Sequence, residues 1–505
     1  MLVQEFLSRT AARLGAKTAL ICGQQRLTFG ELDAMANRLA NALAAHGVRR
    51  GDRVAIHLPN GVEAVVGIFA ALKAGAAFVL VNSSTKEDKL KYILNNCRAT
   101  ALLLPGRCEY LEELWRDVPS LLCGVVCGPG LGREDPRLPS FAAIQEEGDA
   151  AEPPCANIDL DLACLVYTSG STGEPKGVIC DHSNVDFASG SILAYLGTRE
   201  DDVVLSVLPL SFDYGLYQLL MAFKIGATLV LERTFTYPAL ILQRIQEERV
   251  TVFPGVPTIF AMLLQLDRSA FDLSSLRFIT NTAAALPPSH IVELQAGFPG
   301  VTLFSMYGLT ETKRTLYLPP DQLALRPGSV GIPIPGTETW LVDEEGNRLP
   351  PGSTGELVVR GRHVMRGYWE APEATARRYR PGPLPGERVC YSGDLFRTDE
   401  EGYFYFVSRK DDIIKSRGEK VAPKEVENVL QMLPGVMAAV VGVPDPTLGE
   451  AIKAFVVARG RAYSEAEVIA HCRAHLEDFM VPRYVEFRDE LPMTSSGKIS
   501  KLALK

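Results

Sequence analysis

The sequence predicts an α/β protein with a large N-terminal domain, built of layered α/β sheets plus a β-rich subdomain, and a small α+β C-terminal domain. Three observations support this fold class. The 505 residues are too many for one hydrophobic core. Short apolar runs of strand type alternate with helix-type segments over the first two thirds of the chain, as in sheets covered by helices. From about Gly328, turn residues crowd between short alternating strands.

The first elements alternate between helix and strand. Thr28 to Glu31 resembles a helix capping box, and Gly47 is placed to end the helix that follows. A strand is expected at Arg53–Leu58, followed by a helix through Phe69 and Leu72. Further strands are expected at Ala76–Val81, Ala101–Leu104, Val203–Leu208, Ala227–Glu232 and Val250–Pro257.

The last third of the chain has a different texture. A β-rich subdomain is expected at about 328–409, as the final part of an N-terminal core that spans residues 1–409. The highly charged stretch Ser408–Lys420 is the predicted linker. Residues 410–505 then form the predicted α+β C-terminal domain.

Charge and hydropathy exclude two classes of partner. The net charge is −8 without a basic stripe, so nucleic acid is not an expected partner. The most apolar stretch, Val62–Val81, is interrupted by Glu63 and Lys73, so no stable membrane insertion is expected. The first residues lack the pattern of a signal peptide.

The ten cysteines are scattered along the chain. The one close pair, Cys123 and Cys127, has no histidine nearby to complete a metal site. Ten reduced thiols are therefore expected, and they favour a cytoplasmic location.

A glycine-rich loop at Tyr167–Gly177 is the most informative segment. It follows an apolar strand and combines glycines, hydroxyl side chains and Lys176. Glycines allow backbone N–H groups to point inward around a polyphosphate, and hydroxyls add further donors. The loop is not that of a P-loop NTPase, because that motif needs Ser or Thr after its lysine, whereas Gly177 follows Lys176.

This loop resembles the signature of the adenylate-forming superfamily, which includes acyl-CoA synthetases, peptide-synthetase adenylation domains and firefly-type luciferases. Its other signatures occur in the family's order along the chain: Tyr307–Glu311, Tyr391–Leu395, Ser408–Glu427 and Leu491–Ile499. The resemblance implies that a carboxylic acid is activated by ATP to an acyl-adenylate with release of pyrophosphate, and that the acyl group then passes to a thiol. It also implies a mobile C-terminal lid domain.

The resemblance assigns the nucleotide site residue by residue. The β- and γ-phosphates would be bound by Thr168, Ser169, Gly170, Ser171, Thr172, Gly173 and Lys176. The adenine would lie against Ala283, Ala284, Ala285 and Tyr307. Thr310 would contact the α-phosphate, and Glu311 would hold Mg²⁺. Asp394 would bind the ribose hydroxyls, with Arg409 in support.

The C-terminal part would supply a catalytic cation and a hinge. In the resemblance, Lys498 bridges the substrate carboxylate and the α-phosphate. Asp411 falls at the family's hinge, about which the lid rotates after adenylation. That rotation would bring Ser416, Arg417 and Gly418 to line a tunnel for the thiol.

The predicted acyl pocket contains Phe212, Asp213, Tyr214, Val256, Thr282, Met306 and Arg314. Asp213 allows two interpretations: it pairs with the ammonium group of an amino acid substrate, or it forms an internal ion pair with Arg314. The internal pair is favoured. The pocket is then polar, and a long, plain fatty acid is a poor fit.

Coenzyme A is the expected thiol acceptor by analogy. The alternative is the phosphopantetheine of a separate carrier protein, loaded with an amino or acyl acid. A luciferase-like oxygenase shares the implied fold and is the third reading. The sequence leaves open whether the acid is fatty, aryl or amino.

Overall fold

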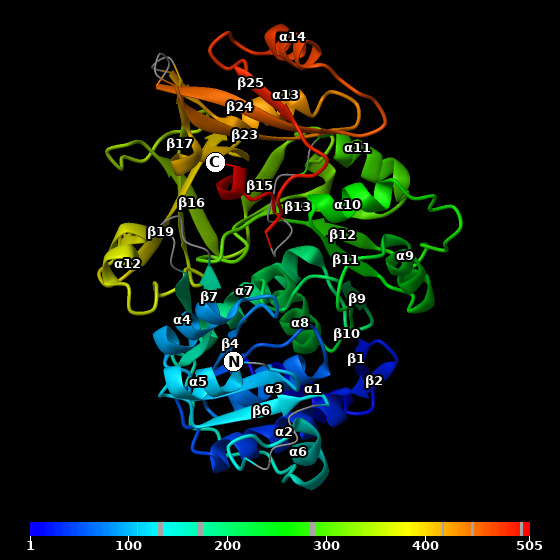
Figure 1. The fold of residues 1–505 in the computed structure, drawn as a ribbon, viewed down its shortest axis with the longest axis vertical. Helices are drawn as coiled ribbons and strands as arrows, with labels where there is room; N and C mark the ends of the chain where they lie inside the picture. Colours follow the sequence, from blue (N-terminus) through cyan, green and yellow to red (C-terminus); the bar gives the residue numbers. More distant parts are fainter. Residues whose placement is uncertain are drawn as a thin grey trace.

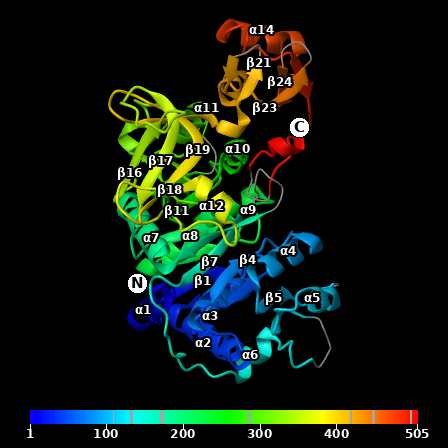
Figure 2. The same cartoon turned by 90° about the vertical axis from the view of Figure 1, so that its left-hand side faces the viewer.

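The computed structural model describes residues 1–108, 110–129, 135–168, 175–282, 286, 288–416, 419–445, 449–494 and 498–504. Within them lie three β-sheets. Figures 1 and 2 place the N-terminal sheet at one end of the molecule and the C-terminal sheet at the other, with the largest sheet between them.

The N-terminal sheet has six strands. In spatial order they are β6 (Cys123–Cys127), β5 (Ala101–Pro105), β3 (Arg53–Ile56), β4 (Ala77–Leu80), β7 (Leu162–Thr168) and β8 (Lys176–Asp181). Neighbouring strands are parallel except for β7 and β8, which form an antiparallel hairpin. The strands predicted at Arg53–Leu58, Ala76–Val81 and Ala101–Leu104 are confirmed as β3, β4 and β5.

Six helices accompany this first part of the chain: α1 (Glu5–Leu14), α2 (Phe29–Ala45), α3 (Val62–Lys73), α4 (Glu87–Cys97), α5 (Leu111–Asp117) and α6 (Phe141–Glu147). The predicted capping box is present, because Thr28 Oγ1 accepts from the Glu31 N–H and the Glu31 carboxylate accepts from the Thr28 N–H. Gly47 follows the helix with φ 94°. The described residues hold no helix long and apolar enough to cross a membrane.

The central sheet contains fourteen of the described strands. In order they are β16 (Thr337–Val342), β17 (Thr354–Gly361), β19 (Arg388–Thr398), β20 (Phe404–Arg409), β15 (Ser329–Pro333), β14 (Leu316–Leu318), β13 (Thr302–Tyr307), β12 (Phe278–Asn281), β11 (Val252–Gly255), β9 (Val203–Ser206), β10 (Thr228–Leu231), β1 (Thr18–Cys22) and β2 (Gln25–Thr28), with β18 (Tyr379–Pro381) paired to β19. The strands from β13 to β1 are parallel. The predicted β-rich region is not a separate sheet, because β14 and β15 join it to the parallel strands.

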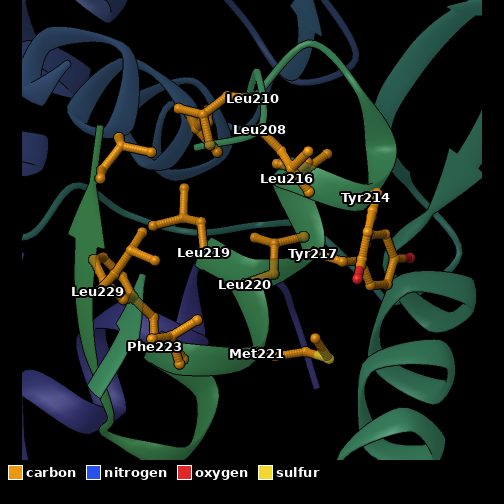
Figure 3. Packing of buried hydrophobic residues seen from close by; sticks show 14 of the residues in the cluster. Leu208, Leu210, Tyr214, Leu216, Tyr217, Leu219, Leu220, Met221, Phe223 and Leu229 are labelled. Carbon is orange, nitrogen blue, oxygen red and sulfur yellow. The ribbon is translucent and has the colours of Figure 1, made fainter. Parts of the chain in front are cut away.

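The helices of this part are α7 (His182–Leu196), α8 (Asp213–Ile225), α9 (Pro238–Glu247), α10 (Pro257–Leu264), α11 (Pro288–Gly297) and α12 (Pro372–Arg378), with a 3₁₀ turn at Pro320–Gln322. Helix α8 runs through the main hydrophobic core. Figure 3 shows Leu219, Leu220 and Phe223 packed near Leu229 of β10, while Tyr214 and Tyr217 lie together on another side of the helix. Both tyrosines belong to the same buried cluster, so α8 is enclosed by the core on more than one side.

The C-terminal sheet contains β22 (Glu419–Val421), β21 (Ile414–Ser416), β24 (Gly449–Ala458), β23 (Val436–Asp445) and β25 (Tyr484–Phe487). Two helices, α13 (Pro423–Leu430) and α14 (Glu465–His475), complete a separate hydrophobic core with it. Two 3₁₀ turns lie at Lys410–Asp412 and Lys501–Leu504. In Figure 2 the last segment, in red, lies between this domain and the rest of the molecule.

Candidate active site

Asp394 lies in a buried position where two strands bring it to partners far away in sequence. The pairing of β19 with β20 sets Asp394 opposite Arg409, whose Nε is 3.8 Å from Asp394 Oδ1. The Tyr307 hydroxyl, at the end of β13, donates to Asp394 Oδ2 at 2.5 Å. Burial raises the pKa of Asp394, while Arg409 and the Tyr307 hydrogen bond act to lower it. The Asp394 carboxylate can therefore accept hydrogen bonds from a pair of hydroxyl groups.

Glu311 is held in the turn that follows β13. It is 7% exposed, and its Oε1 accepts from the Tyr368 hydroxyl at 2.5 Å. Lys176 Nζ lies 5.8 Å from the centre of the Tyr368 ring, so one tyrosine contacts both the carboxylate and the lysine of the glycine-rich loop. Lys176 and Glu311 are thus brought to one place from two different sheets.

Arg378 is a third member of this group, and sequence reasoning did not identify it. It is the last residue of α12, and its Nη2 lies 3.7 Å from Glu311 Oε1. Burial acts to lower its pKa, but Glu311 and other nearby groups hold the pKa above the ordinary value. Its Nε is buried without a hydrogen-bond partner. The only sequence signal was a basic residue at a helix C-terminus, which is common on surfaces.

Lys498 reaches this site from the far end of the chain. Its Nζ lies 5.8 Å from the centre of the Phe212 ring, at the start of α8. Burial lowers the pKa of Lys498, and the carboxylates of Asp213, Asp394 and Glu311 oppose that effect. The lysine therefore stands between the predicted acyl pocket and the Asp394–Glu311 region. Its segment is closed by a hydrogen bond from the Thr494 N–H to the Lys498 carbonyl, 2.7 Å.

The acyl pocket residues converge at one edge of the central sheet. The parallel strands β11, β12 and β13 end side by side, and Val256, Thr282 and Met306 lie buried at or next to those ends. Helix α8 begins beside them, and the Tyr214 hydroxyl bonds to Thr280 Oγ1 at 2.6 Å.

The predicted ion pair between Asp213 and Arg314 is wrong. Both side chains are buried, but within the described part of the chain no hydrogen bond or ion pair joins them. The Arg314 guanidinium instead stacks over Tyr214, with Cζ 4.3 Å from the ring centre. The turn after β13 carries Arg314 to the face of Tyr214, a placement that residue spacing could not reveal.

Several predicted residues lie outside the described part of the chain. They are Ser169, Gly170, Ser171, Thr172, Gly173, Ala283, Ala284, Ala285, Arg417 and Gly418. The ends of the glycine-rich loop are described: Thr168 and Lys176 are paired at the tip of the β7–β8 hairpin.

Thr310 is half-buried beside Glu311. The C-terminal predictions fall on separate elements. Asp411 is exposed in the 3₁₀ turn at Lys410–Asp412, between the central and C-terminal sheets. Ser416 is buried at the end of β21.

The donor set suits a nucleotide with several phosphates. Lys176, Arg378 and Lys498 are cations in a largely buried setting, and Arg378 Nε has no acceptor from the protein. Among the described residues no cluster of three or more His, Cys, Asp or Glu side chains could hold a metal. A cation at Glu311 would therefore need phosphate or water oxygens as its other ligands, which is the coordination that Mg²⁺ accepts.

Comparison with known proteins agrees with this arrangement. A family model described as AMP-binding enzyme matches residues 7–369. This chain belongs to that family. A second model, the C-terminal domain of AMP-binding enzymes, matches residues 425–498, so Lys498 lies at the end of the matched region. The resemblance to the adenylate-forming superfamily is confirmed.

Relatives of this AMP-binding enzyme are similar over nearly the whole chain. A feruloyl-CoA synthase from Amycolatopsis sp. is 38% identical over 492 residues, covering 96% of this chain and 94% of the relative. A long-chain-fatty-acid–CoA ligase from Bacillus subtilis is 33% identical, covering 99% and 94%. The crystal structure of the anthranilate CoA ligase AuaEII with anthranoyl-AMP superimposes with a TM-score of 0.91 at 31% identity, covering 100% of this chain and 96% of that one.

Proposed function

We propose that this protein is an AMP-forming acid–CoA ligase. It activates a carboxylic acid with ATP and passes the acyl group to coenzyme A. The observation that carries the proposal is the position of Lys498 over Phe212, next to Asp213, Asp394 and Glu311. The long, flexible Lys498 side chain is thereby held where the proposed acyl pocket meets the proposed nucleotide site.

The first step is adenylation. A carboxylate oxygen attacks the α-phosphorus of ATP, the bond from that phosphorus to the bridging oxygen breaks, and pyrophosphate leaves. Two anions must approach each other, so the reaction needs fixed positive charge where they meet. Lys498 supplies that charge, and Asp213 helps to keep the lysine protonated because it opposes the effect of burial on the pKa.

Nucleotide binding uses the groups that converge around Tyr307 and Glu311. Asp394 accepts hydrogen bonds from the ribose hydroxyls, with Arg409 beside it. Thr168, Lys176 and the loop between them take the β- and γ-phosphates, and Thr310 takes the α-phosphate. The adenine lies near Tyr307, with residues 283–285 as its remaining neighbours. Glu311 would hold Mg²⁺, which would neutralise charge on the phosphates.

The second step is thioester formation. The thiol sulfur attacks the acyl carbonyl, loses its proton, and AMP leaves as the acyl C–O bond breaks. Rotation of the C-terminal domain (residues 410–505) about Asp411 exchanges Lys498 for Ser416, at the end of β21, and for Arg417 and Gly418, which follow it in the sequence. An exposed turn between two sheets suits a hinge, because its backbone angles can change without breaking a core.

Coenzyme A is preferred over a carrier protein as acceptor because the relatives are CoA ligases. All ten cysteines are free thiols, and this supports a reducing compartment such as the cytoplasm.

The test measures the two half-reactions separately in Lys498→Ala. Acid-dependent ATP–pyrophosphate exchange is expected to fall on the order of 10²–10³-fold, because a preorganised charge at the reacting phosphate is lost. ATP binding, followed by calorimetry, should change little. Transfer to coenzyme A from chemically prepared acyl-adenylate should also persist, because Lys498 acts in the first step. A Lys498→Ala protein with normal exchange would contradict the mechanism.

A parallel assay settles the acceptor. Wild-type protein is given acid and ATP with either coenzyme A or a phosphopantetheinylated carrier protein. The proposal expects the acyl-CoA thioester, and formation of the carrier thioester alone would overturn it.

A further inference from the structure

Arg314 is a buried cation for which the protein supplies no anion. The side chain is 2% exposed, and both Nε and Nη2 are buried without a hydrogen-bond partner. The described residues form no ion pair with it. The nearest resolved interaction is its stacking on Tyr214, with Cζ 4.3 Å from the ring centre.

The phenol groups around Arg314 are already engaged elsewhere. The Tyr214 hydroxyl bonds to Thr280 Oγ1 at 2.6 Å, and the Tyr195 hydroxyl contacts Met306 Sδ at 2.8 Å. Burial raises the pKa of both tyrosines, to about 12 for Tyr214, and the charge of Arg314 acts against that rise. Both phenols therefore stay neutral at physiological pH and cannot balance the guanidinium.

The carboxylate that begins α8 does not balance it either. Asp213 is 8% exposed and forms no ion pair with any described residue. Its charge raises the pKa of Lys498 against burial, and it does the same for Lys313, which is 1% exposed. Glu311 also acts on both lysines, and among the described residues neither Asp213 nor Glu311 forms an ion pair with Arg314.

An uncompensated charge in a buried site is costly. A water molecule could accept hydrogen bonds from Nε and Nη2, but it would leave the charge unbalanced. An anion that enters the pocket would accept these hydrogen bonds and also balance the positive charge. Arg314 is stacked on Tyr214, whose hydroxyl bonds to Thr280 Oγ1 in β12, so this contact places the guanidinium beside the strand ends that line the predicted acyl pocket.

We propose that the acid activated by this protein carries a second carboxylate, which Arg314 binds inside the acyl pocket. This inference rests on the proposed ligase activity. One carboxylate of the substrate faces Lys498 and reacts, and the other receives the Nε and Nη2 hydrogen bonds of Arg314. A planar guanidinium is well suited to bind a carboxylate with two parallel hydrogen bonds. An acid with an apolar tail would leave both donors unpaired.

The test compares matched pairs of acids that differ by the second charge. ATP–pyrophosphate exchange is measured with succinate and butyrate, with phthalate and 2-methylbenzoate, and with glutamate and norvaline. In each productive pair the doubly acidic member is expected to have the higher kcat/KM, on the order of 10²-fold or more, because the site would otherwise keep buried donors unpaired.

Two variants then assign the preference to Arg314. Arg314→Met should abolish the preference by raising KM for the doubly acidic acid, whereas Arg314→Lys should keep part of it. The affinity for a non-reactive, doubly acidic acyl-sulfamoyl adenosine, measured by calorimetry, should fall in Arg314→Met by a factor similar to the lost preference in kcat/KM. The thermal midpoint of Arg314→Met should not fall, since the change removes an unpaired buried charge.

Arg397→Met is the matched control. Arg397 is exposed and stacks on Tyr405 with Cζ 4.5 Å from the ring centre. The variant therefore loses the same charge and the same type of ring contact, but away from the acyl pocket. Its acid preference should equal that of wild type.

The outcomes separate this inference from the proposed function. Faster exchange with butyrate, 2-methylbenzoate or norvaline than with their doubly acidic partners overturns the inference and leaves the ligase activity standing. An unchanged preference in Arg314→Met overturns it as well. Absence of exchange with every acid, in a protein that binds ATP, overturns the proposed function and this inference with it.

Discussion

Glu311 shows how much a single site residue depends on its partners. The carboxylate accepts from the Tyr368 hydroxyl and lies 3.7 Å from Arg378 Nη2. Those contacts fix its orientation before any cation binds, and they partly balance its charge. The Tyr368 ring also faces Lys176, so Glu311 and Lys176 share one neighbour. Arg378, the last residue of α12, thereby acts on Glu311 although it belongs to none of the signature motifs.

Arg378→Met is predicted to lower kcat/KM for ATP by about 10–10²-fold, because the phosphates lose one fixed cation and Glu311 loses a charged neighbour. KM for the carboxylic acid should change little, since Arg378 lies on the nucleotide side. Steady-state kinetics with ATP and acid varied separately measure both effects.

Arg378→Lys should recover part of the loss, because the charge remains while the planar donor geometry does not. Exposed Arg380, stacked on Tyr391 with Cζ 3.9 Å from the ring centre, is the control, and Arg380→Met should behave as wild type. Equal losses in both variants would show that Arg378 acts only through general charge or folding.

At the scale of elements, the turn after β13 places most of the site. It carries Thr310, Glu311 and Arg314 within a few residues, and it folds back so tightly that the Thr315 N–H bonds to the Tyr307 carbonyl at 2.9 Å. Lys313 has φ 58°, a conformation that is costly for a residue with a side chain. The strained turn is stabilised by its buried setting, and it holds Glu311 beside Tyr368 and Arg314 beside Tyr214.

Gly308→Ala is predicted to displace this turn and thereby lower the activity of the enzyme. A Cβ at Gly308 would lie 1.8 Å from the Lys313 carbonyl oxygen, a contact that only backbone movement can relieve. The displacement of Thr310 and Glu311 should lower the exchange rate by about 10²-fold, because small errors in positioning are expensive in catalysis. ATP–pyrophosphate exchange and circular dichroism together test whether activity falls in a folded protein.

Gly190→Ala is the control for that substitution. Gly190 lies inside α7, where a Cβ would meet Lys224 Nζ at an ordinary 3.4 Å. A glycine-to-alanine change within a helix should raise stability by about 0.5–1 kcal/mol and leave exchange intact. Full activity in Gly308→Ala would contradict the role of the tight turn.

A second element links the two large sheets at the site. The segment 365–369 bonds to β8 through the Trp369 N–H and the Gly177 carbonyl, 2.7 Å, and to the turn through the Met365 N–H and the Glu311 carbonyl, 3.0 Å. The β7–β8 hairpin and the turn after β13 therefore have a common backbone partner. That partner sets the distance between the β7–β8 hairpin and Glu311.

At the scale of the whole molecule, two buried histidines connect stability to pH. His182 and His363 are fully buried, and desolvation lowers the pKa of each to about 4. The Val3 N–H donates to His182 Nδ1, so that nitrogen is an unprotonated acceptor. Both side chains are neutral in the folded protein and would gain protons on unfolding in mild acid.

The fold is therefore predicted to lose stability as the pH falls from about 6.5 toward 4. In that interval the unfolded chain binds more protons than the folded one, so the free energy of unfolding decreases with decreasing pH. Each histidine contributes at most about 3 kcal/mol, which is the pKa difference multiplied by 1.36 kcal/mol per unit.

His182→Gln is the variant that checks this prediction, because the glutamine oxygen can accept from Val3 without titrating. Urea unfolding at a series of pH values between 4 and 7 should show a shallower pH dependence in the variant than in wild type. Surface His475, in the last turn of α14, is the control, and His475→Gln should keep the wild-type slope. Parallel slopes for all three proteins would contradict a role for His182.

The sequence by itself determined the alternation of strands and helices, the capped helix at Phe29–Ala45 and the signatures that carry Lys176, Glu311, Asp394 and Lys498. These features are local: periodicity, capping and motif order depend on residues near one another in the chain. The composition and spacing of the glycine-rich loop are also local, and the polyphosphate-binding role that they indicate stays a prediction.

Tertiary structure decided what depends on distant contacts. Arg378 joins Glu311 across 67 positions of sequence, Arg314 stacks on Tyr214 instead of pairing with Asp213, and the β-rich strands continue the central sheet. Each of these results depends on which side chains meet after packing, and a buried charge finds its partner through the fold and not through its neighbours in sequence. The choice between a paired and an unpaired Arg314, on which the proposed second carboxylate of the acid rests, could therefore be made only in three dimensions.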